Sequence, residues 1–318
     1  MQTNFSLAQL RNPATAEAEK ILRACVHCGF CTATCPTFLL LGDELDSPRG
    51  RIYLIKDMLE KNSPADETVV KHIDRCLSCL ACMTACPSGV NYMHLVDHAR
   101  SHIETTYKRP IADRLLRAFL DFVLPHPKRF RFALAVAPLA RPFKALYPRL
   151  GRTGRRLAAM MRLAPVSGRK AQASSRYAAP PPRSAPIARV ALFRGCVQPV
   201  LRPAIDDAAV RLFSRLGVES VQLPGEGCCG ALLHHLGKEK VALAQARANI
   251  DVWSAEFERN GIDAIVITAS GCGTMIKDYG KAIYAAARPA PTTFWNRRLL
   301  SGCAIARSKI FWRRRPIS

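Results

Sequence analysis

Two runs of four cysteines constrain the fold of this chain more than any other feature of its sequence. The first run has the spacing C-x2-C-x2-C-x3-C-P, and the second repeats it 51 residues later. Their members are Cys25, Cys28, Cys31 and Cys35, followed by Pro36, and Cys76, Cys79, Cys82 and Cys86, followed by Pro87. Gaps of two residues let one tight loop present three thiolates to the corners of an iron–sulfur cubane. A structural zinc site needs only four ligands, usually as two separated pairs, so two complete runs favour iron–sulfur clusters over zinc knuckles or merely buried thiols.

The order of these cysteines also predicts how two clusters share them. In bacterial two-cluster ferredoxins the fourth cysteine of such a run ligates the other cluster. We therefore expect two 4Fe-4S clusters, one held by Cys25, Cys28, Cys31 and Cys86 and the other by Cys76, Cys79, Cys82 and Cys35. The prolines are expected to stop a helix and to turn the fourth cysteine toward the neighbouring cluster.

The residues between the ligands are expected to tune the clusters rather than to bind iron. Gly29, Ser78 and Ala81 are small enough to leave backbone N–H groups open to the sulfides. His27 lies inside the first loop, where the cysteines already complete the ligand set. We expect it beside the cluster or at the surface, and not as a ligand.

The net charge of +23 is unevenly distributed along the chain. Residues 108–190 hold 19 Lys and Arg against two acids, residues 279–318 hold nine and no acid, and the rest has a net charge of −3. Because both cysteine runs lie outside these stretches, we expect a basic linker and tail that meet anionic lipid or an acidic partner, and no nucleic-acid partner. The basic residues of the bridge either dock on such a surface or form an ordinary solvated helix face; they are Arg129, Arg131, Arg141 and Lys144, among Phe130, Phe132 and Phe143.

Cysteine usage and hydropathy indicate the compartment. Thirteen cysteines in a chain without an export signal favour metal or redox chemistry over a disulfide framework. Residues 1–15 are polar, and no apolar run reaches the roughly 18 residues that a transmembrane helix needs. We expect a cytoplasmic protein, soluble or peripheral on the inner face of the cell membrane.

The expected secondary structure changes along the chain from helices alone to strands that alternate with helices. Helices are expected around the cysteine loops at residues 14–24, 49–61 and 92–105, and a Pro-rich linker near 172–186. From residue 187, strands at 187–193, 218–223 and 263–268 alternate with helices at 203–216 and 238–259, which favours βαβ units and a parallel sheet. The expected domains are a two-cluster domain (1–107), a basic helical bridge and linker (108–187), an α/β domain (188–280) and a basic tail (281–318).

A second group of cysteines follows these strands. Cys196, Cys228, Cys229 and Cys272 are each next to glycine or to another cysteine. Since the carboxyl ends of parallel strands meet at one edge of a sheet, we expect the four to converge there. Adjacent cysteines rarely serve packing alone, and a disulfide between them would be strained. The sequence therefore predicts a third metal or redox site, with a reduced thiol cluster as the alternative.

Together these motifs resemble the iron–sulfur subunits of the glycolate oxidase family. The resemblance covers residues 1–107 and about 187–280. It is carried by Cys25 to Thr37, by Asp46-Ser-Pro-Arg-Gly-Arg-Ile, by Glu226-Gly-Cys-Cys-Gly-Ala-Leu with His234, and by the turn at Cys272. More distant similarity extends to lactate-utilisation proteins, the anaerobic glycerol-3-phosphate dehydrogenase small subunit and heterodisulfide reductase subunits.

The resemblance implies a mixed α+β fold, in which an α-helical ferredoxin domain precedes a cysteine-rich CCG domain of α/β type. It implies a subunit that is not catalytic alone and passes electrons toward the respiratory chain from FAD-containing partner subunits, which oxidise glycolate to glyoxylate. The family pattern has two Cys-Cys-Gly modules, and only one is recognisable here. Met275 stands where some relatives have cysteine, and Cys303 lies isolated in the basic tail. The loss of acidic residues after residue 278 is what a frameshift or truncated reading frame would produce, so we expect an incomplete CCG domain.

Other functions remain open at this level. The chain could serve a related lactate or glycerol-3-phosphate dehydrogenase, because substrate specificity would reside on the flavin subunit. It could instead be a heterodisulfide-reductase-like catalytic subunit, which needs a full ligand set in the second domain, or a remnant that only supports assembly. No G-x-G-x-x-G loop in a strand–turn–helix context indicates a dinucleotide site in this chain.

Overall fold

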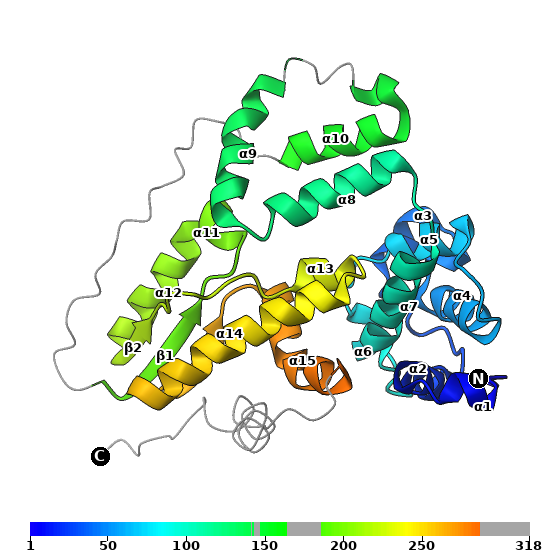
Figure 1. Ribbon diagram of the computed structural model, residues 1–318, viewed down its shortest axis with the longest axis horizontal. Coiled ribbons are helices and arrows are strands. Elements are labelled where there is room, and N and C mark those ends of the chain that lie inside the picture. Colours follow the sequence, from blue (N-terminus) through cyan, green and yellow to red (C-terminus); the bar gives the residue numbers. More distant parts are fainter. Residues whose placement is uncertain (141, 143–146, 164–185, 287–318) are drawn as a thin grey trace. The chain divides into compact units, whose positions relative to one another are not determined.

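A computed structural model describes residues 1–140, 142, 147–163 and 186–286. Contacts divide the chain into two compact units, one of residues 1–169 with 230–242 and the other of residues 170–229 with 243–318. The predicted Pro-rich linker, Cys303, Arg141, Phe143 and Lys144 lie outside the described residues, as does the tail beyond residue 286. Figure 1 shows the order of the helices and strands along the chain.

All the secondary-structure elements described in the first unit are helices. Its elements are α1 (Leu7–Leu10), α2 (Pro13–Ala24), α3 (Pro36–Leu41), the 3-10 helix η1 (Glu44–Asp46), α4 (Pro48–Glu60), α5 (Glu67–Asp74), α6 (Ala81–Thr84), α7 (Tyr92–Thr106), α8 (Ile111–Val123), α9 (Pro127–Ala140), η3 (Tyr147–Leu150), α10 (Gly151–Leu163) and α13 (Ala231–His235). The three helices expected from the periodicity correspond to α2, α4 and α7, and these predictions are confirmed.

Local signals set where these helices begin. Ser47 caps α4 by accepting a hydrogen bond from the N–H of Gly50, and Pro48 occupies its first turn, where a missing N–H costs nothing. Asn12 caps α2 ahead of Pro13 in the same way. Asp66 caps α5 by accepting from Val69 at 2.7 Å. The helices that surround the cysteine loops therefore start at fixed positions.

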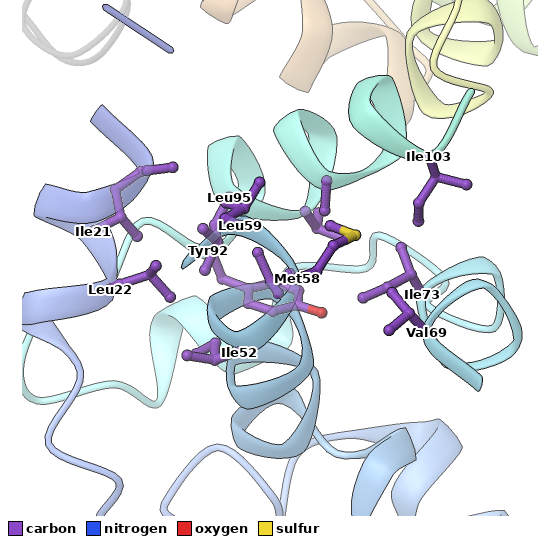
Figure 2. Packing of buried hydrophobic residues seen from close by; sticks show 14 of the residues in the cluster. Ile21, Leu22, Ile52, Met58, Leu59, Val69, Ile73, Tyr92, Leu95 and Ile103 are labelled. Carbon is purple, nitrogen blue, oxygen red and sulfur yellow. The ribbon is translucent and has the colours of Figure 1, made fainter. Parts of the chain in front are cut away.

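The core of the first unit lies between α2, α4, α5 and α7 (Figure 2). Fully buried apolar side chains come from each of these helices: Leu22, Ile55, Ile73, Leu95 and Ile103. Burial of each stabilises the fold by about 1.5–3 kcal/mol before the entropy of ordering is counted. This packing brings the loop before α3 and the loop before α6 to the same end of the α4 helix, because Pro48 contacts cavities lined by both loops.

The second unit contains a three-stranded parallel sheet. Its described elements are β1 (Ala188–Phe193), α11 (Gln198–Leu201), α12 (Pro203–Arg215), β2 (Val218–Val221), most of α14 (Glu239–Asn260), β3 (Ala264–Ile267) and α15 (Ser270–Ala286). The strand order is β2-β1-β3, with Ala188 opposite Val218 and Val190 opposite Ala264. The central strand β1 is buried from Val190 to Phe193. The alternation of strands and helices expected from the sequence is confirmed.

Two local expectations are wrong in detail. Pro36 does not stop a helix but opens α3, because its fixed φ suits the first position of a helix. Cys272 does not lie in a free turn but in the first turn of α15, which begins at Ser270 directly after the strand. None of the described helices combines the length and apolar character required to cross a membrane.

Candidate functional site

Two cavities in the first unit are lined by the eight cysteines of the two runs. The first, with an empty volume of about 440 Å³, is lined by Cys25, Cys28, Cys31, Cys82 and Cys86. The second, of about 330 Å³, is lined by Cys35, Cys76, Cys79 and Cys82. Each cavity thus receives three cysteines of one run and the fourth cysteine of the other, and Cys82 borders both. The sulfur donor sets fit one cubane per cavity.

The two loops turn in the same way at equivalent positions. Two and four residues after the first cysteine of each run, the backbone adopts left-handed φ values: His27 at 55° and Gly29 at 85°, and Ser78 at 50° and Leu80 at 59°. Only glycine adopts this conformation without strain, so three of the four positions carry a conformational cost of about 1 kcal/mol each. The repeated strain supports a common loop geometry that the ligand sulfurs require.

The fourth cysteine of each run lies outside the loop that carries the first three. Cys35 is the N-cap residue of α3, and Cys86 precedes the turn and loop that lead to α7. The N–H of Val90 donates to Sγ of Cys86 at 3.5 Å. A proline after each fourth cysteine fixes the exit of the chain at both places.

The sulfur of Cys35 lies among several polar groups. The Thr37 hydroxyl lies 3.2 Å from Sγ, and Arg51 Nη1 lies 3.9 Å from it. Burial, the largest single influence, opposes ionisation, but hydrogen bonds from Thr37 and the N–H of Phe38, with the charge of Arg51, lower the pKa of Cys35 below its ordinary value. A thiolate ligand is favoured at this position.

Other cysteines of the runs ionise less readily on their own. Burial raises the pKa of Cys82 to about 12, and the neighbouring Cys76 adds to the effect. Burial also raises the pKa of Cys31. Thiolates at these two positions therefore require a cation close by, which is the condition that bound iron supplies.

Tyr92 and Pro48 lie between the two cavities and line both. The Tyr92 ring is 4% exposed and belongs to the apolar core in Figure 2. Its hydroxyl donates to Sγ of Cys76 at 3.7 Å, and burial raises its pKa well above the ordinary value. The sequence analysis placed Tyr92 only at the start of an expected helix and did not predict its contact with a ligand sulfur.

His27 borders the first cavity, with its ring edge-on to Tyr53. Burial and the nearby N-terminal charge lower its pKa, and Nε2 is buried without a hydrogen-bond partner among the described residues. A sulfide in this cavity would supply a partner, so the residue fits a position beside a cluster. The sequence had left a surface position equally open.

The second group of cysteines converges in the second unit. Cys196 follows β1, and its Sγ lies 3.4 Å from Sγ of Cys228. A hydrogen bond from Cys229 lowers the pKa of Cys272, whereas the contact with Cys228, followed by burial, raises that of Cys196. The structure thus brings together the four cysteines that the sequence predicted to meet. Met275 is buried in the core of the unit and adds no thiolate.

Asn249 and Tyr279 hold the backbone of the Cys228-Cys229 pair. Asn249 is fully buried, accepts from the N–H of Gly227 at 2.8 Å and donates to the carbonyl of Cys228 at 3.0 Å. The Tyr279 hydroxyl donates to the carbonyl of Cys229 at 2.8 Å. Neither residue was found from the sequence, although a lone Asn on the buried face of a long helix is a usable signal.

Comparison with known proteins gives two family matches, one around each group of cysteines. Residues 21–90 match the family model of the 4Fe-4S dicluster domain, and residues 190–277 match that of the cysteine-rich domain. The chain is 44% identical over 283 residues to the glycolate oxidase iron-sulfur subunit of Escherichia coli, covering 89% of this chain and 64% of that protein. No solved structure matches the chain.

Two further relatives extend the comparison. The probable glycolate oxidase iron-sulfur subunit of Bacillus subtilis is 33% identical over 295 residues, covering 88% of this chain and 64% of its own length. A subunit of the dihydromethanophenazine:CoB–CoM heterodisulfide reductase of Methanosarcina barkeri is 23% identical over 271 residues, covering 79% of this chain and 56% of its own length. The chain therefore spans a little under two thirds of the length of the glycolate oxidase subunits it matches.

Proposed function

We propose that this chain is the electron-transfer subunit of a glycolate-oxidising complex. The chain is a relative of the glycolate oxidase iron-sulfur subunits, and it carries both a 4Fe-4S dicluster domain and a cysteine-rich domain. FAD-containing partner subunits oxidise glycolate to glyoxylate, and this subunit passes the electrons toward the respiratory chain. When bound, the two clusters supply one-electron carriers in series, which suits a flavin that releases two electrons.

The convergence of the eight cysteines on two cavities carries this proposal. Cys25, Cys28, Cys31 and Cys86 hold one cluster, and Cys76, Cys79, Cys82 and Cys35 hold the other. Because Cys82 borders both cavities, the cavity linings alone also permit a different partition. The spacing rule for two-cluster ferredoxins selects the exchanged partition.

Paired serine substitutions separate the exchanged arrangement from a local one. If the fourth cysteines are exchanged, Cys25→Ser with Cys86→Ser removes ligands from one cluster, and about four of roughly eight irons remain. Cys25→Ser with Cys35→Ser then removes ligands from both clusters. The local arrangement gives the opposite pattern. Iron and acid-labile sulfide are measured on anaerobically purified protein, and a wild type that is colourless and binds zinc overturns the proposal.

The substrate and partners are tested through the complex. We expect the tagged chain to co-purify with flavoproteins, and the complex to reduce an artificial dye with glycolate. Faster reduction with lactate or glycerol 3-phosphate assigns the subunit to a related dehydrogenase instead. Failure to restore growth on glycolate to a strain that lacks the iron-sulfur subunit, although the complex assembles, supports the remnant hypothesis.

The cysteines of the second unit form a third redox or metal site in this proposal. Cys196, Cys228, Cys229 and Cys272 supply four sulfurs. The sulfurs of Cys196 and Cys228 lie 3.4 Å apart and must separate modestly before a small metal group fits between them. Iron well above eight per chain supports a third cluster. Disulfide reduction by the isolated chain would favour the heterodisulfide-reductase-like alternative.

The helix α8 supports association with a membrane surface. Ile111, Leu115, Phe119 and Phe122 lie on one helical face and are 48–73% exposed. Together with the basic residues of α9, this face fits the interface of anionic lipid, on the inner leaflet of the cell membrane. Co-sedimentation with vesicles that contain phosphatidylglycerol should weaken in high salt and with Leu115→Glu. Equal binding to neutral vesicles contradicts it.

A further inference from the structure

Two arginines in the first turn of α4 lie beside the two cavities in different surroundings. Arg49 lines the first cavity, has a side chain 38% exposed, and pairs with Glu44 at 2.6 Å. Arg51 lines the second cavity, is 1% exposed, and places Nη1 3.9 Å from Sγ of Cys35. Solvent and salt screen the first charge far more than the second. The two cavities therefore differ in the charge that acts on their sulfurs.

The remaining donors of Arg51 fix its orientation. Nε donates to the carbonyl of His72 at 2.7 Å. Nη2 donates to the Thr37 hydroxyl at 3.0 Å and to Asp46 Oδ1 at 3.2 Å. Because Thr37 also lies 3.2 Å from Sγ of Cys35, the guanidinium and the hydroxyl approach the same sulfur together. The buried guanidinium cannot turn away without losing several hydrogen bonds.

Arg51 shares its nearest counter-charge with a second guanidinium group. Asp46 is fully buried and accepts from Arg51 and from His72 Nδ1 at 3.0 Å through Oδ1, and from Arg75 at 2.6 Å through Oδ2. Two guanidinium groups thus share one carboxylate. Asp43, 3.9 Å from His72, is 39% exposed and Arg75 is 40% exposed, so solvent screens these two opposite charges to a similar degree. Among these groups the guanidinium of Arg51 contacts the ligand sulfur, with Nη1 3.9 Å from Sγ of Cys35, so its positive charge is the one placed closest to the second cavity.

We propose that Arg51 raises the reduction potential of the cluster held by Cys35, Cys76, Cys79 and Cys82 above that of the cluster held by Cys25, Cys28, Cys31 and Cys86. The inference rests on the ligand sets of the proposed function. Reduction adds one negative charge, and a buried cation that donates toward a ligand sulfur stabilises the more negative state. Arg51 thereby favours reduction of the cluster in the second cavity over reduction of the cluster in the first.

A redox titration followed by electron paramagnetic resonance tests this assignment on the anaerobically purified full chain. We expect Arg51→Met to lower one of the two midpoint potentials, with a tenfold smaller ratio of reduced to oxidised cluster at a fixed potential, which is about 59 mV for one electron. Arg51→Lys, which keeps the charge, should fall between wild type and Arg51→Met. Arg49→Met is the matched control at the first cavity. It should leave unchanged the midpoint potential that Arg51→Met lowers.

A second variant keeps the test decisive if Arg51→Met does not fold. Arg75 is 40% exposed, so Arg75→Gln should be tolerated while it leaves Asp46 free to neutralise Arg51 more fully. The same potential should then fall, by less than in Arg51→Met. Cys35→Ser identifies the resonance that belongs to the second cavity, because an oxygen ligand alters that signal alone.

The outcomes separate this inference from the proposed function. A wild type without two cluster signals, or with a partition other than the exchanged one, overturns the ligand sets. Two intact signals whose potentials do not move in Arg51→Met and Arg75→Gln overturn the role of Arg51. An equal shift in Arg49→Met overturns it as well, because the effect would then be one of overall charge.

Discussion

Asp97 Oδ2, near the middle of α7, lies 3.3 Å from Nε2 of His234 in α13. The other oxygen of Asp97 lies 3.2 Å from Nδ1 of His235, and Arg100 lies 3.5 Å away in the same helix. Hydrogen bonds from both histidines hold the pKa of Asp97 well below its ordinary value, although burial is the largest single influence and acts in the opposite direction. One buried carboxylate therefore fixes a short helix that directly follows Cys229 in the sequence.

Asp97→Ala should release α13 from α7. Breaking a buried ionic contact leaves its partners uncompensated and costs about 3–5 kcal/mol. We expect faster amide exchange across Ala231–His235 and a lower midpoint of denaturant unfolding. Asp57→Ala is the control, because Asp57 forms an exposed pair with Lys61 that contributes less than about 1 kcal/mol. Equal losses in the two variants would show that Asp97 has no special role.

His98 gives the first unit a dependence on pH. Burial lowers its pKa, His102 lowers it further, and Glu239 and Glu17 oppose the shift. Below its unfolded pKa of about 6.5, the unfolded chain binds more protons at this residue than the folded chain. Stability should therefore rise with pH toward about 6.5 and fall as the solution is acidified, by up to about 1.4 kcal/mol per pH unit.

His98→Gln should remove this contribution to the acid loss. The measurement is the free energy of unfolding between pH 8 and 5.5 under anaerobic conditions. His126→Gln, at an exposed position, should keep the slope of the wild type. The assignment is wrong if His98→Gln loses stability with acid as steeply as the wild type.

Asn249 should be the most sensitive non-cysteine residue around the second group of cysteines. Asn249→Ala leaves the N–H of Gly227 and the carbonyl of Cys228 without their partner, at a cost of roughly 1–3 kcal/mol each if they stay buried. We expect Cys228 and Cys229 to react faster with a maleimide. Asn260→Ala, which removes only an exposed contact with Glu256, should not change that rate.

Periodicity and cysteine spacing predict most of the framework. The helices α2, α4 and α7 follow from apolar spacing, because a buried helix face imposes a period of 3.6 on the residues that make it. The strands β1 to β3 follow instead from short apolar runs. The short helices α3, α6 and α13 could not be found in this way. Each has six residues or fewer, too few for a period to appear in the sequence.

The ligands were predictable, whereas their surroundings were only partly so. Cysteine is chemically specific, and its spacing carries the geometry of a loop. Arg51 lay in a motif that we had noted, and it precedes Ile55 and Met58 at helical spacing, so a cation on an apolar face was a readable signal. The distance between Arg51 and Cys35 could not be predicted from the sequence, because it depends on how α4 packs against η1.

The packing of α4 against η1 depends on Gly50. A Cβ built at this residue would lie 2.1 Å from the carbonyl oxygen of Glu44 and 3.0 Å from Cα of Leu45. Any side chain must therefore push η1 away from α4. The displaced segment includes Asp46, whose carbonyl oxygen lies 2.9 Å from the Thr37 hydroxyl beside Cys35.

Gly50→Ala should loosen the second cavity before the first. Overpacking typically costs about 1–3 kcal/mol, and here the contact is with backbone that cannot rotate aside. We expect a lower unfolding midpoint. We also expect about half of the iron to be lost during anaerobic dialysis against a chelator, and the lost iron should come from the cluster whose signal Cys35→Ser identifies. Gly280→Ala is the control, since its Cβ meets nothing within 4 Å in α15, and it should gain about 0.5–1 kcal/mol. Full iron retention in Gly50→Ala would show that η1 can move without disturbing Cys35.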